Sequence, residues 1–515
     1  QFLLLEVILG MPFRFSLAFV FVFLGAQMEA QVKNVLISSD FNPNEVSIAI
    51  SQKRPNVQVA ASNLNNLYYS SDSGRTWTQT QISCPYGIWG DPILVSDANG
   101  IFYYFHLTNP SEGTWIDRLV CQRSMDGGKT WTSGIAFGLN GKKKQDKEGV
   151  AVHPKTGELF VTWTQFDAYG SKNPLDSSVI LFSKSADRGE TWSAPKRISF
   201  FAGDCLDSSN TVEGAIPALG ENNEVFVSWS GPKGIVFQKS MDGGNSWLPM
   251  EKVVVPGHSW TFDVPGIYRC NGLPQTVYSR NQKKISILYT DQSKGKWDTD
   301  VWLVSSIDAG ETWNKPIRIN QDAPGKHQFF SWGALDETTG KLWVIYYDRR
   351  NYTNALTDVF LASSTNGETF VEQKISQQPF LPTDKVFFGD YSSVAVHGSM
   401  VRPMWTRLDQ GALSVWTALV EDTLSTVVVQ ENVEVMDASA SAYVSFKLKK
   451  SALVQLKLVD MNGVTKAEVW VNELKSPGKY IVPIDKKALR ISEGLYYYVL
   501  DIEGFPSKKK LITVR

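Results

Sequence analysis

Short segments that alternate apolar and polar residues recur along most of the chain. Seven of them are six or seven residues long and rich in β-branched and aromatic side chains, a pattern typical of strands. They occupy residues 57–62, 101–107, 159–165, 225–230, 285–291, 342–348 and 401–407. We expect each to lie in the middle of one sheet, so the pattern predicts an all-β protein.

A polar octet recurs between these segments. It reads SSDSGRTW at 70–77, SMDGGKTW at 124–131, SADRGETW at 185–192, SMDGGNSW at 240–247 and SIDAGETW at 306–313, with a degenerate copy, SSTNGETF, at 363–370. Its third residue recurs at intervals of 54, 61, 55, 66 and 57 residues, as Asp72, Asp126, Asp187, Asp242, Asp308 and Thr365. Self-similarity at this period indicates a repeat architecture.

The residue types of the octet explain its spacing. An Asp carboxylate accepts hydrogen bonds from backbone N–H groups that follow it, which closes a tight turn. The Gly two positions later tolerates a left-handed backbone. The final Trp can be buried between adjacent sheets. Each octet is therefore predicted to be a turn between two strands, with a structural and not a catalytic role.

The octets resemble the Asp-boxes, or BNR repeats, of sialidases and their relatives. The resemblance implies a β-propeller whose octets join the third and fourth strands of each blade on one face, with ligand sites on the other face. The seven alternating segments favour seven blades over residues 32–421, with six blades as the alternative. Residues 414–420 end the last unit without an octet, so residues 32–39 are expected to add its outer strand and close the ring.

The N-terminal residues have a different pattern. Met11 opens a stretch with a positive charge at Arg14 and an apolar run over 15–24, which is the layout of a signal peptide. The run is too short to span a bilayer. We therefore expect residues 1–10 to be upstream read-through and 11–30 a signal peptide. The protein is then secreted or attached to the outer cell surface, with no transmembrane segment in the mature chain.

The tail forms a separate unit. Residues 422–440 have the composition of a linker, and residues 441–515 alternate as short strands with regular turn signals, which predicts a small Ig-like antiparallel β-sandwich. Its motif order is similar to that of the sorting domain of the Bacteroidota type IX secretion system, with LVDMNG, GKY and GLYY at 458–463, 478–480 and 494–497. The resemblance implies the secretion machinery as a partner.

Charge and cysteine content narrow the function classes. A net charge of −1 and a pI near 6.6 give no basic field for nucleic acid. The four cysteines lack the spacing of a metal site, and no nucleotide fingerprint occurs, so no cofactor is expected. In an exported chain they could form two disulfides or remain free thiols; the nearest pairs are Cys84–Cys121 and Cys205–Cys270.

Charged and aromatic residues interrupt the strand pattern in the loops expected opposite the octets. A carboxylic acid with a raised pKa can protonate a leaving oxygen while a second group acts as base or nucleophile. Arginines can hold an anionic sugar through paired hydrogen bonds. The catalytic candidates are Asp91, Glu148, Glu213, Asp390 and Tyr391, and the substrate-binding candidates are Arg269, His327, Arg349, Arg350 and Arg407.

The resemblance implies a carbohydrate-active enzyme of glycoside hydrolase type that acts on extracellular glycans. In a sialidase-like site, Glu213 and Tyr391 would form the nucleophile pair and Asp91 the acid, with a carboxylate-gripping triad of Arg269, Arg349 or Arg350, and Arg407. The FRIP-type segment of sialidases is missing ahead of the first octet, which argues against exo-sialidase activity. The alternatives are a non-catalytic propeller that binds glycan or protein, and a polysaccharide lyase that uses His258 or His327 with Tyr391.

Overall fold

The computed structural model describes residues 32–422, 428–432, 442–448, 452–461, 463–476, 478–502 and 505–514. These residues form antiparallel sheets and one short helix, α1 (Lys486–Leu489). The predicted all-β class is confirmed. The expected read-through segment and signal peptide, residues 1–30, lie outside the described residues.

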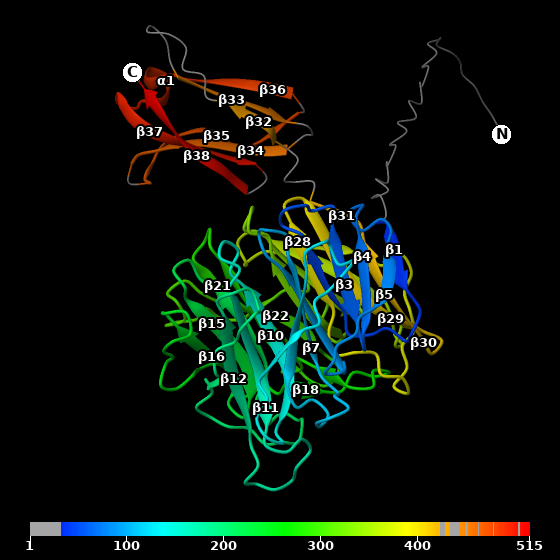
Figure 1. Ribbon diagram of the computed structural model, residues 1–515. Helices are drawn as coiled ribbons and strands as arrows, with labels where there is room; N and C mark the ends of the chain where they lie inside the picture. The colour runs from blue at the N-terminus through cyan, green and yellow to red at the C-terminus, as the bar shows by residue number, and fades with distance from the viewer. Residues whose placement is uncertain are drawn as a thin grey trace, which may run out of the picture. The chain divides into compact units, whose positions relative to one another are not determined.

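Residues 32–422 fold into six four-stranded sheets, a short hairpin and a final sheet of five strands (Figure 1). The first contains β2 (Ser47–Ile50), β3 (Gln58–Ser62), β4 (Asn66–Ser70) and β5 (Thr78–Gln81). The second contains β6 (Gly90–Ser96), β7 (Phe102–Leu107), β8 (Leu119–Ser124) and β9 (Ile135–Phe137). The third contains β10 (Lys144–Val152), β11 (Leu159–Phe166), β12 (Ser178–Ser185) and β13 (Lys196–Arg197).

The next three sheets repeat this order. The fourth contains β14 (Glu213–Leu219), β15 (Val225–Gly231), β16 (Gly234–Ser240) and β17 (Lys252–Pro256). The fifth contains β20 (Gln275–Ser279), β21 (Lys284–Asp291), β22 (Asp300–Ser306) and β23 (Ile317–Arg318). The sixth contains β24 (Gln328–Leu335), β25 (Leu342–Asp348), β26 (Asp358–Ser364) and β27 (Val371–Lys374). A separate hairpin, β18 (Thr261–Phe262) and β19 (Cys270–Asn271), precedes the fifth sheet.

The last sheet joins the two ends of this region. It contains β28 (Ser393–His397), β29 (Met400–Asp409), β30 (Ala412–Ala418), β31 (Val420–Glu421) and β1 (Asn34–Ser38). Strand β1 pairs with β30 in the register Asn34↔Ala418, so the N-terminal segment supplies the outer strand, as predicted.

The sheets form a closed ring. The first strand of each sheet contacts the first strand of the next, and β28 contacts β2. The blue strand β1 therefore lies beside the yellow strand β30 (Figure 1). Each alternating segment found in the sequence coincides with the second strand of a sheet, as predicted.

Each octet is the turn between the third and fourth strands of its sheet. In the second sheet, the Oδ1 atom of Asp126 accepts hydrogen bonds from the backbone N–H groups of Lys129 (3.1 Å) and Thr130 (2.9 Å), and its Oδ2 atom accepts one from Thr130 Oγ1 (2.6 Å). The octet tryptophans pack on the preceding sheet, and Trp192 stacks on Phe137 with ring centroids 4.0 Å apart. The predicted structural role of the octets is confirmed.

The sixth octet departs from the alignment made from sequence. Thr365 occupies the third position, but Asn366 takes the part of the Asp. Its Oδ1 atom accepts hydrogen bonds from the N–H groups of Glu368 (2.8 Å) and Thr369 (3.0 Å). Ser364 Oγ accepts a hydrogen bond from the N–H of Gly367, three residues later in the chain. In the second octet the corresponding bond, from Gly128 N–H to Ser124 Oγ, joins residues four apart. The turn of the sixth octet is therefore one residue shorter.

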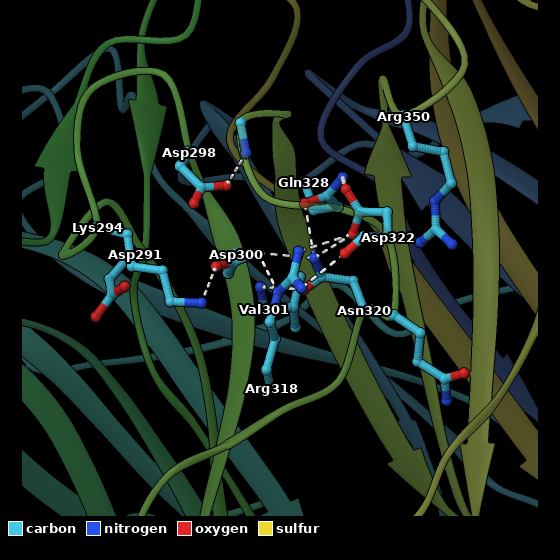
Figure 2. A network of polar contacts seen from close by, with 12 residues as sticks. Asp291, Lys294, Asp298, Asp300, Val301, Arg318, Asn320, Asp322, Gln328 and Arg350 are labelled. Atoms are coloured by element: carbon cyan, nitrogen blue, oxygen red, sulfur yellow. Dashed lines mark hydrogen bonds and ion pairs between the residues drawn. The ribbon is translucent and has the colours of Figure 1, made fainter.

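A buried polar network braces the fifth and sixth sheets (Figure 2). Arg318 Nε contacts Asp300 Oδ1 at 2.5 Å, and its Nη2 contacts Asp322 Oδ1 at 3.0 Å. Asn320 Nδ2 donates to both Asp300 Oδ1 and Gln328 Oε1 at 2.8 Å. Gln328 begins β24, so the network joins the outer part of one sheet to the inner strand of the next.

The C-terminal region consists of two antiparallel sheets. One contains β32 (Val428–Asn432), β33 (Ala442–Leu448) and β36 (Gly478–Ile484). The other contains β34 (Ala452–Val459), β35 (Thr465–Lys475), β37 (Gly494–Ile502) and β38 (Phe505–Val514). Both contribute to one apolar core that includes Phe446, Leu456 and Tyr498. Strand β32 lies within the segment expected to be a linker and pairs with β33.

All four cysteines are free thiols. Of the two alternatives, disulfides or free thiols, the structure therefore has free thiols. Among the described residues, no helix is long and apolar enough to cross a membrane.

Candidate active site

A cavity of about 820 Å³, the axial cavity, opens where the first strands of several sheets begin. Glu45 precedes β2, Asp91 and Lys147 lie near the starts of β6 and β10, and Asp390 precedes β28. Successive strands of a sheet run in opposite directions. The start of the first strand and the turn between the third and fourth therefore lie at opposite ends, so the axial cavity opens away from the octets.

Irregular backbone directs these side chains into the cavity. Glu45, Asp91, Lys147 and Asp207 have φ angles of 50°, 53°, 49° and 54°, in the left-handed region that side-chain-bearing residues rarely adopt. Asp91 and Lys147 lie at breaks in the strand register, between Gly90 and Ile93 and between Asp146 and Gly149. Such bulges redirect side chains, and backbone strain of this kind concentrates at functional sites.

Lys147 lies at the centre of the charged groups. Its Nζ atom is 3.0 Å from Asp390 Oδ2, 3.2 Å from Asp91 Oδ2 and 3.9 Å from Glu45 Oε1. It also lies 5.6 Å from the centroid of the Tyr391 ring. One ammonium group thus holds carboxylates from three sheets around the axis.

Arg269 provides a second positive charge and contacts the same carboxylate. Its Nε atom donates to Asp390 Oδ1 at 2.8 Å, and its Nη2 atom contacts Asp390 Oδ2. Asn271 Nδ2 donates to the Asp390 backbone oxygen at 2.9 Å. Asp390 is therefore fixed in place and compensated by two cations.

The carboxyl groups of the cavity differ in protonation. Burial would raise the pKa of Asp390, but the charges of Lys147 and Arg269 lower it to about 2. Burial, together with the negative charge of Asp91, raises the pKa of Asp146 to about 7. Burial also raises the pKa of Glu45 well above its ordinary value. At neutral pH the cavity therefore contains an ionised carboxylate, Asp390, and a carboxyl group, Asp146, that is about half protonated.

Aromatic rings form one wall of the axial cavity. Trp89 and Trp115 pack edge to face with centroids 5.7 Å apart, and Trp115 and Tyr169 do so at 5.2 Å. Trp89 remains 40% exposed. Tyr169 donates its hydroxyl hydrogen to Asp207 Oδ2 at 2.6 Å. Flat apolar faces beside carboxylates suit the mixed apolar and hydroxylated surface of a sugar.

A smaller space of about 60 Å³, the inner chamber, shares Asp91, Lys147 and Asp390 with the axial cavity. Glu148 and Tyr391 line it. Neither carboxylate oxygen of Glu148 nor the Tyr391 hydroxyl has a hydrogen-bond partner among the described residues. Burial raises the pKa of both groups well above their ordinary values.

Of the catalytic candidates, Asp91 and Asp390 thus line the axial cavity, while Glu148 and Tyr391 line the inner chamber. Glu213 is fully buried and lines neither space. The charges of Asp207 and Asp146 add to burial in raising its pKa. The predicted pairing of Glu213 with Tyr391 is not among the contacts of the described residues.

The arginines predicted to grip a carboxylate do not converge. Only Arg269 lines the axial cavity. Arg349 is buried and donates from Nη1 to the Pro265 backbone oxygen at 2.5 Å. Arg350 pairs with Asp348 and Glu372 near the network of Figure 2. Arg407 donates to the backbone oxygens of Gln378 and Pro379 and pairs with Asp409.

The histidines proposed for a lyase also lie outside the axial cavity. His327 is buried, and its Nδ1 atom is 2.8 Å from Thr299 Oγ1. His258 is buried, and its Nε2 atom is 3.1 Å from the Gly272 backbone oxygen. Burial lowers the pKa of each to about 4.

Several groups of the site were not selected from sequence. Glu45, Asp146, Lys147, Asp207 and the aromatic wall complete the cavity. The charged triplet at 146–148, which precedes the apolar end of its strand, was a usable signal for Asp146 and Lys147. Glu45 had no comparable signal, because a left-handed backbone at a residue other than glycine is not encoded by residue type.

Comparison with solved structures finds similar chains of low sequence identity, several of which are carbohydrate-active enzymes. The Hadza microbial sialidase Hz136 is 14% identical over 71% of this chain and 73% of its own, with a TM-score of 0.41. A PL25 polysaccharide lyase, an ulvan lyase, is 12% identical over 76% and 96%, with a TM-score of 0.45. The α-L-arabinofuranosidase Arb93A from Fusarium graminearum is 11% identical over 77% and 100%, with a TM-score of 0.45.

No family model and no curated protein matches the sequence.

Proposed function

We propose that the protein is a glycoside hydrolase that cleaves glycans in the axial cavity of a seven-bladed, Asp-box propeller. One observation carries the proposal: Asp146, with its pKa near 7, faces the same cavity as the ion-paired carboxylates of Asp91 and Asp390. Two carboxyl groups of opposite protonation are the machinery that glycosidic hydrolysis requires.

The residues suggest a division of roles. Asp146 would donate a proton to the glycosidic oxygen as the bond to the departing sugar breaks. Asp91 would act from its bulge as base or nucleophile toward the developing positive charge at the anomeric carbon. Lys147 keeps Asp91 in place through the 3.2 Å contact and is a positioning residue. Asp390 contacts both Lys147 and Arg269 and so holds these two cations in position.

The charge of the cavity favours a neutral glycan. Both cations, Lys147 and Arg269, already contact Asp390. Asp207 and Asp263 add further negative charge to the lining. An anionic sugar would have to displace these ion pairs, and the other arginines lie elsewhere. The geometry therefore supports neither sialic acid nor a uronic acid as the sugar held in this cavity.

The test is a hydrolysis screen of the purified protein against neutral aryl glycosides, neutral polysaccharides, sialosides and uronic-acid polymers. Asp146→Asn and Asp91→Asn should each lower kcat by at least about 100-fold on the substrate found, the usual size of an acid–base contribution. Asp409→Asn, which changes a half-exposed carboxylate outside the cavity, is the matched control and should keep full activity.

If the wild type hydrolyses none of the four substrate classes but still binds a glycan, the function is glycan binding and not hydrolysis. Release of unsaturated products from a uronic-acid polymer would indicate a lyase.

We further propose that the chain is exported and that its C-terminal sheets form an Ig-like sorting domain read by a type IX secretion machinery. The order of the LVDMNG, GKY and GLYY motifs supports this assignment. Expression in a Bacteroidota host with and without residues 441–515 tests it. The full chain should reach the medium or the cell surface, and the shortened chain should stay in the periplasm.

A further inference from the structure

A second hollow, the side groove, lies next to the axial cavity. Its volume is about 880 Å³, comparable to that of the axial cavity. Thr261, Phe262, Asp263 and Tyr268 line both spaces. The two hollows are therefore separated only by the hairpin over residues 261–271, which forms a ridge between them.

The ridge is held rigidly. Phe262 pairs with Cys270 across the hairpin, and Val264 and Ile267 are buried in the apolar core beneath it. Arg349 donates to the Pro265 backbone oxygen at 2.5 Å, and Gln292 Nε2 donates to the Asp263 backbone oxygen at 2.8 Å. A ridge fixed from both sides does not close over either hollow, so one extended ligand can lie across it.

Two aromatic side chains are exposed along this path. Tyr268, on the ridge, is 60% exposed, and Trp297, in the loop between β21 and β22, is 73% exposed. Exposed large aromatic rings are characteristic of binding surfaces. Asp263, Ser293 and Lys296 supply polar groups beside them.

The loop that carries Trp297 is pinned at its base (Figure 2). Lys294 Nζ lies 3.2 Å from Asp300 Oδ2, and Asp298 Oδ1 accepts the Gly325 N–H at 2.7 Å. The backbone N–H of Gly295 donates to the Gln292 backbone oxygen at 2.9 Å. A pre-ordered loop loses little conformational freedom when a ligand binds. The exposed indole is thus a fixed surface.

We infer that the side groove binds the portion of a polysaccharide that extends beyond the axial cavity, with Tyr268 and Trp297 as stacking surfaces for successive sugar rings. The inference rests on the proposed hydrolysis and names its substrate class: a neutral polymer of several sugar units, not a single terminal sugar. The continuity of the two hollows, the exposed rings and the adjacent polar groups all suit a chain of hydroxylated rings.

The test compares long and short substrates. Trp297→Ala, Trp297→Phe and the control Phe200→Ala are assayed on the neutral polysaccharide found in the screen and on the matching aryl monoglycoside. Phe200 is 59% exposed but lines neither hollow. Trp297→Ala should raise KM for the polymer about three- to tenfold, the size of one lost aromatic stack, and leave the monoglycoside unchanged. Trp297→Phe should recover most of the loss.

Binding is measured separately by affinity electrophoresis in gels that contain arabinan, xylan, laminarin or galactomannan. At least one polymer should retard the wild type, and Trp297→Ala should reduce that retardation. If the wild type hydrolyses no substrate but Trp297→Ala is still retarded less than the wild type, the proposed hydrolysis is wrong and the inferred binding of polysaccharide in the side groove is supported. Absence of retardation by every polymer, equal retardation of the two proteins, or an equal loss of activity on long and short substrates overturns the inference.

Discussion

At the scale of single residues, the axial cavity depends on one lysine. Lys147 contacts carboxylates that enter from three different sheets, and its side chain is only 15% exposed. Its charge offsets the repulsion between Asp91 and Asp390, the two carboxylates that it contacts most closely. Removing one partner from a buried charged group leaves the others uncompensated, which costs more than an intact ion pair contributes.

Lys147→Met should therefore lower the free energy of unfolding by roughly 3–5 kcal/mol. The control is Lys143→Met, because Lys143 makes a more exposed ion pair with Asp167 at 2.7 Å. Its loss should cost less than about 1 kcal/mol. Urea unfolding monitored by tryptophan fluorescence measures both, and equal losses would contradict the central role of Lys147.

Asp146 predicts a pH dependence at the same scale. Its pKa near 7 lies above the value of about 4 for an unfolded Asp, so the folded protein binds more protons between these limits. Its contribution to stability is therefore greatest below pH 4 and declines as the pH rises to 7. A general acid must also be protonated, so kcat should fall as the pH rises above about 7.

Asp146→Asn should abolish the fall in kcat above about pH 7. Between pH 4 and 7 the melting temperature of the variant should rise relative to wild type. Parallel melting curves for the two proteins across this range would show that Asp146 is not a buried, proton-holding acid.

At the scale of elements, each octet turn is stabilised by hydrogen bonds between residues of the same octet. Thr130 and Ser124 hydroxyl groups and two backbone N–H groups all donate to Asp126. Burial alone would raise the pKa of Asp126, but these hydrogen bonds lower it. The stability it contributes is thus present above the unfolded pKa and is lost as the pH falls through the lowered value.

Asp126→Ala should destabilise the protein by about 1–2 kcal/mol, as for the loss of a comparable cap. Asp126→Asn should cost less, because an amide oxygen still accepts the Lys129 and Thr130 N–H bonds, as Asn366 does in the sixth octet. Denaturation at pH 7 ranks the variants. An Asn variant as damaged as the Ala variant would show that the charge, and not the acceptor, holds the turn.

Elements were predictable where their chemistry is local. The turn at Asp126 and the buried strands follow from residues within one octet or one alternating segment. The site depends on distant contacts instead: Asp390 reaches Lys147 from 243 residues away, and Arg349 reaches Pro265 from 84 residues away. The Asp-Arg-Arg run at 348–350 has residue types that often bind anionic ligands. In the folded protein, however, both arginines contact other protein groups and stabilise the fold.

At the scale of the whole molecule, the ring of sheets is closed by a strand from the opposite end of the region. Strand β1 covers the edge of β30, and Ile37 is 8% exposed in the adjoining core. Without β1, the backbone groups of β30 would face solvent as an unpaired edge, which favours aggregation.

A chain that begins at Ser39 should therefore melt at least about 5 °C below a chain that begins at Val32. It should also aggregate in size-exclusion chromatography. The longer chain is the matched control, because it lacks the same N-terminal residues 1–31 but retains β1. Identical melting temperatures would mean that the ring is stable without this closure.

The pairing of β1 with β30 also sets an order of events in the cell. Asn34 is synthesised hundreds of residues before its partner Ala418, a delay on the order of tens of seconds at ordinary translation rates. During that time the first strand emerges from the ribosome with nothing to pair with. Whatever holds the nascent chain must shield this segment until nearly the whole ring has been made.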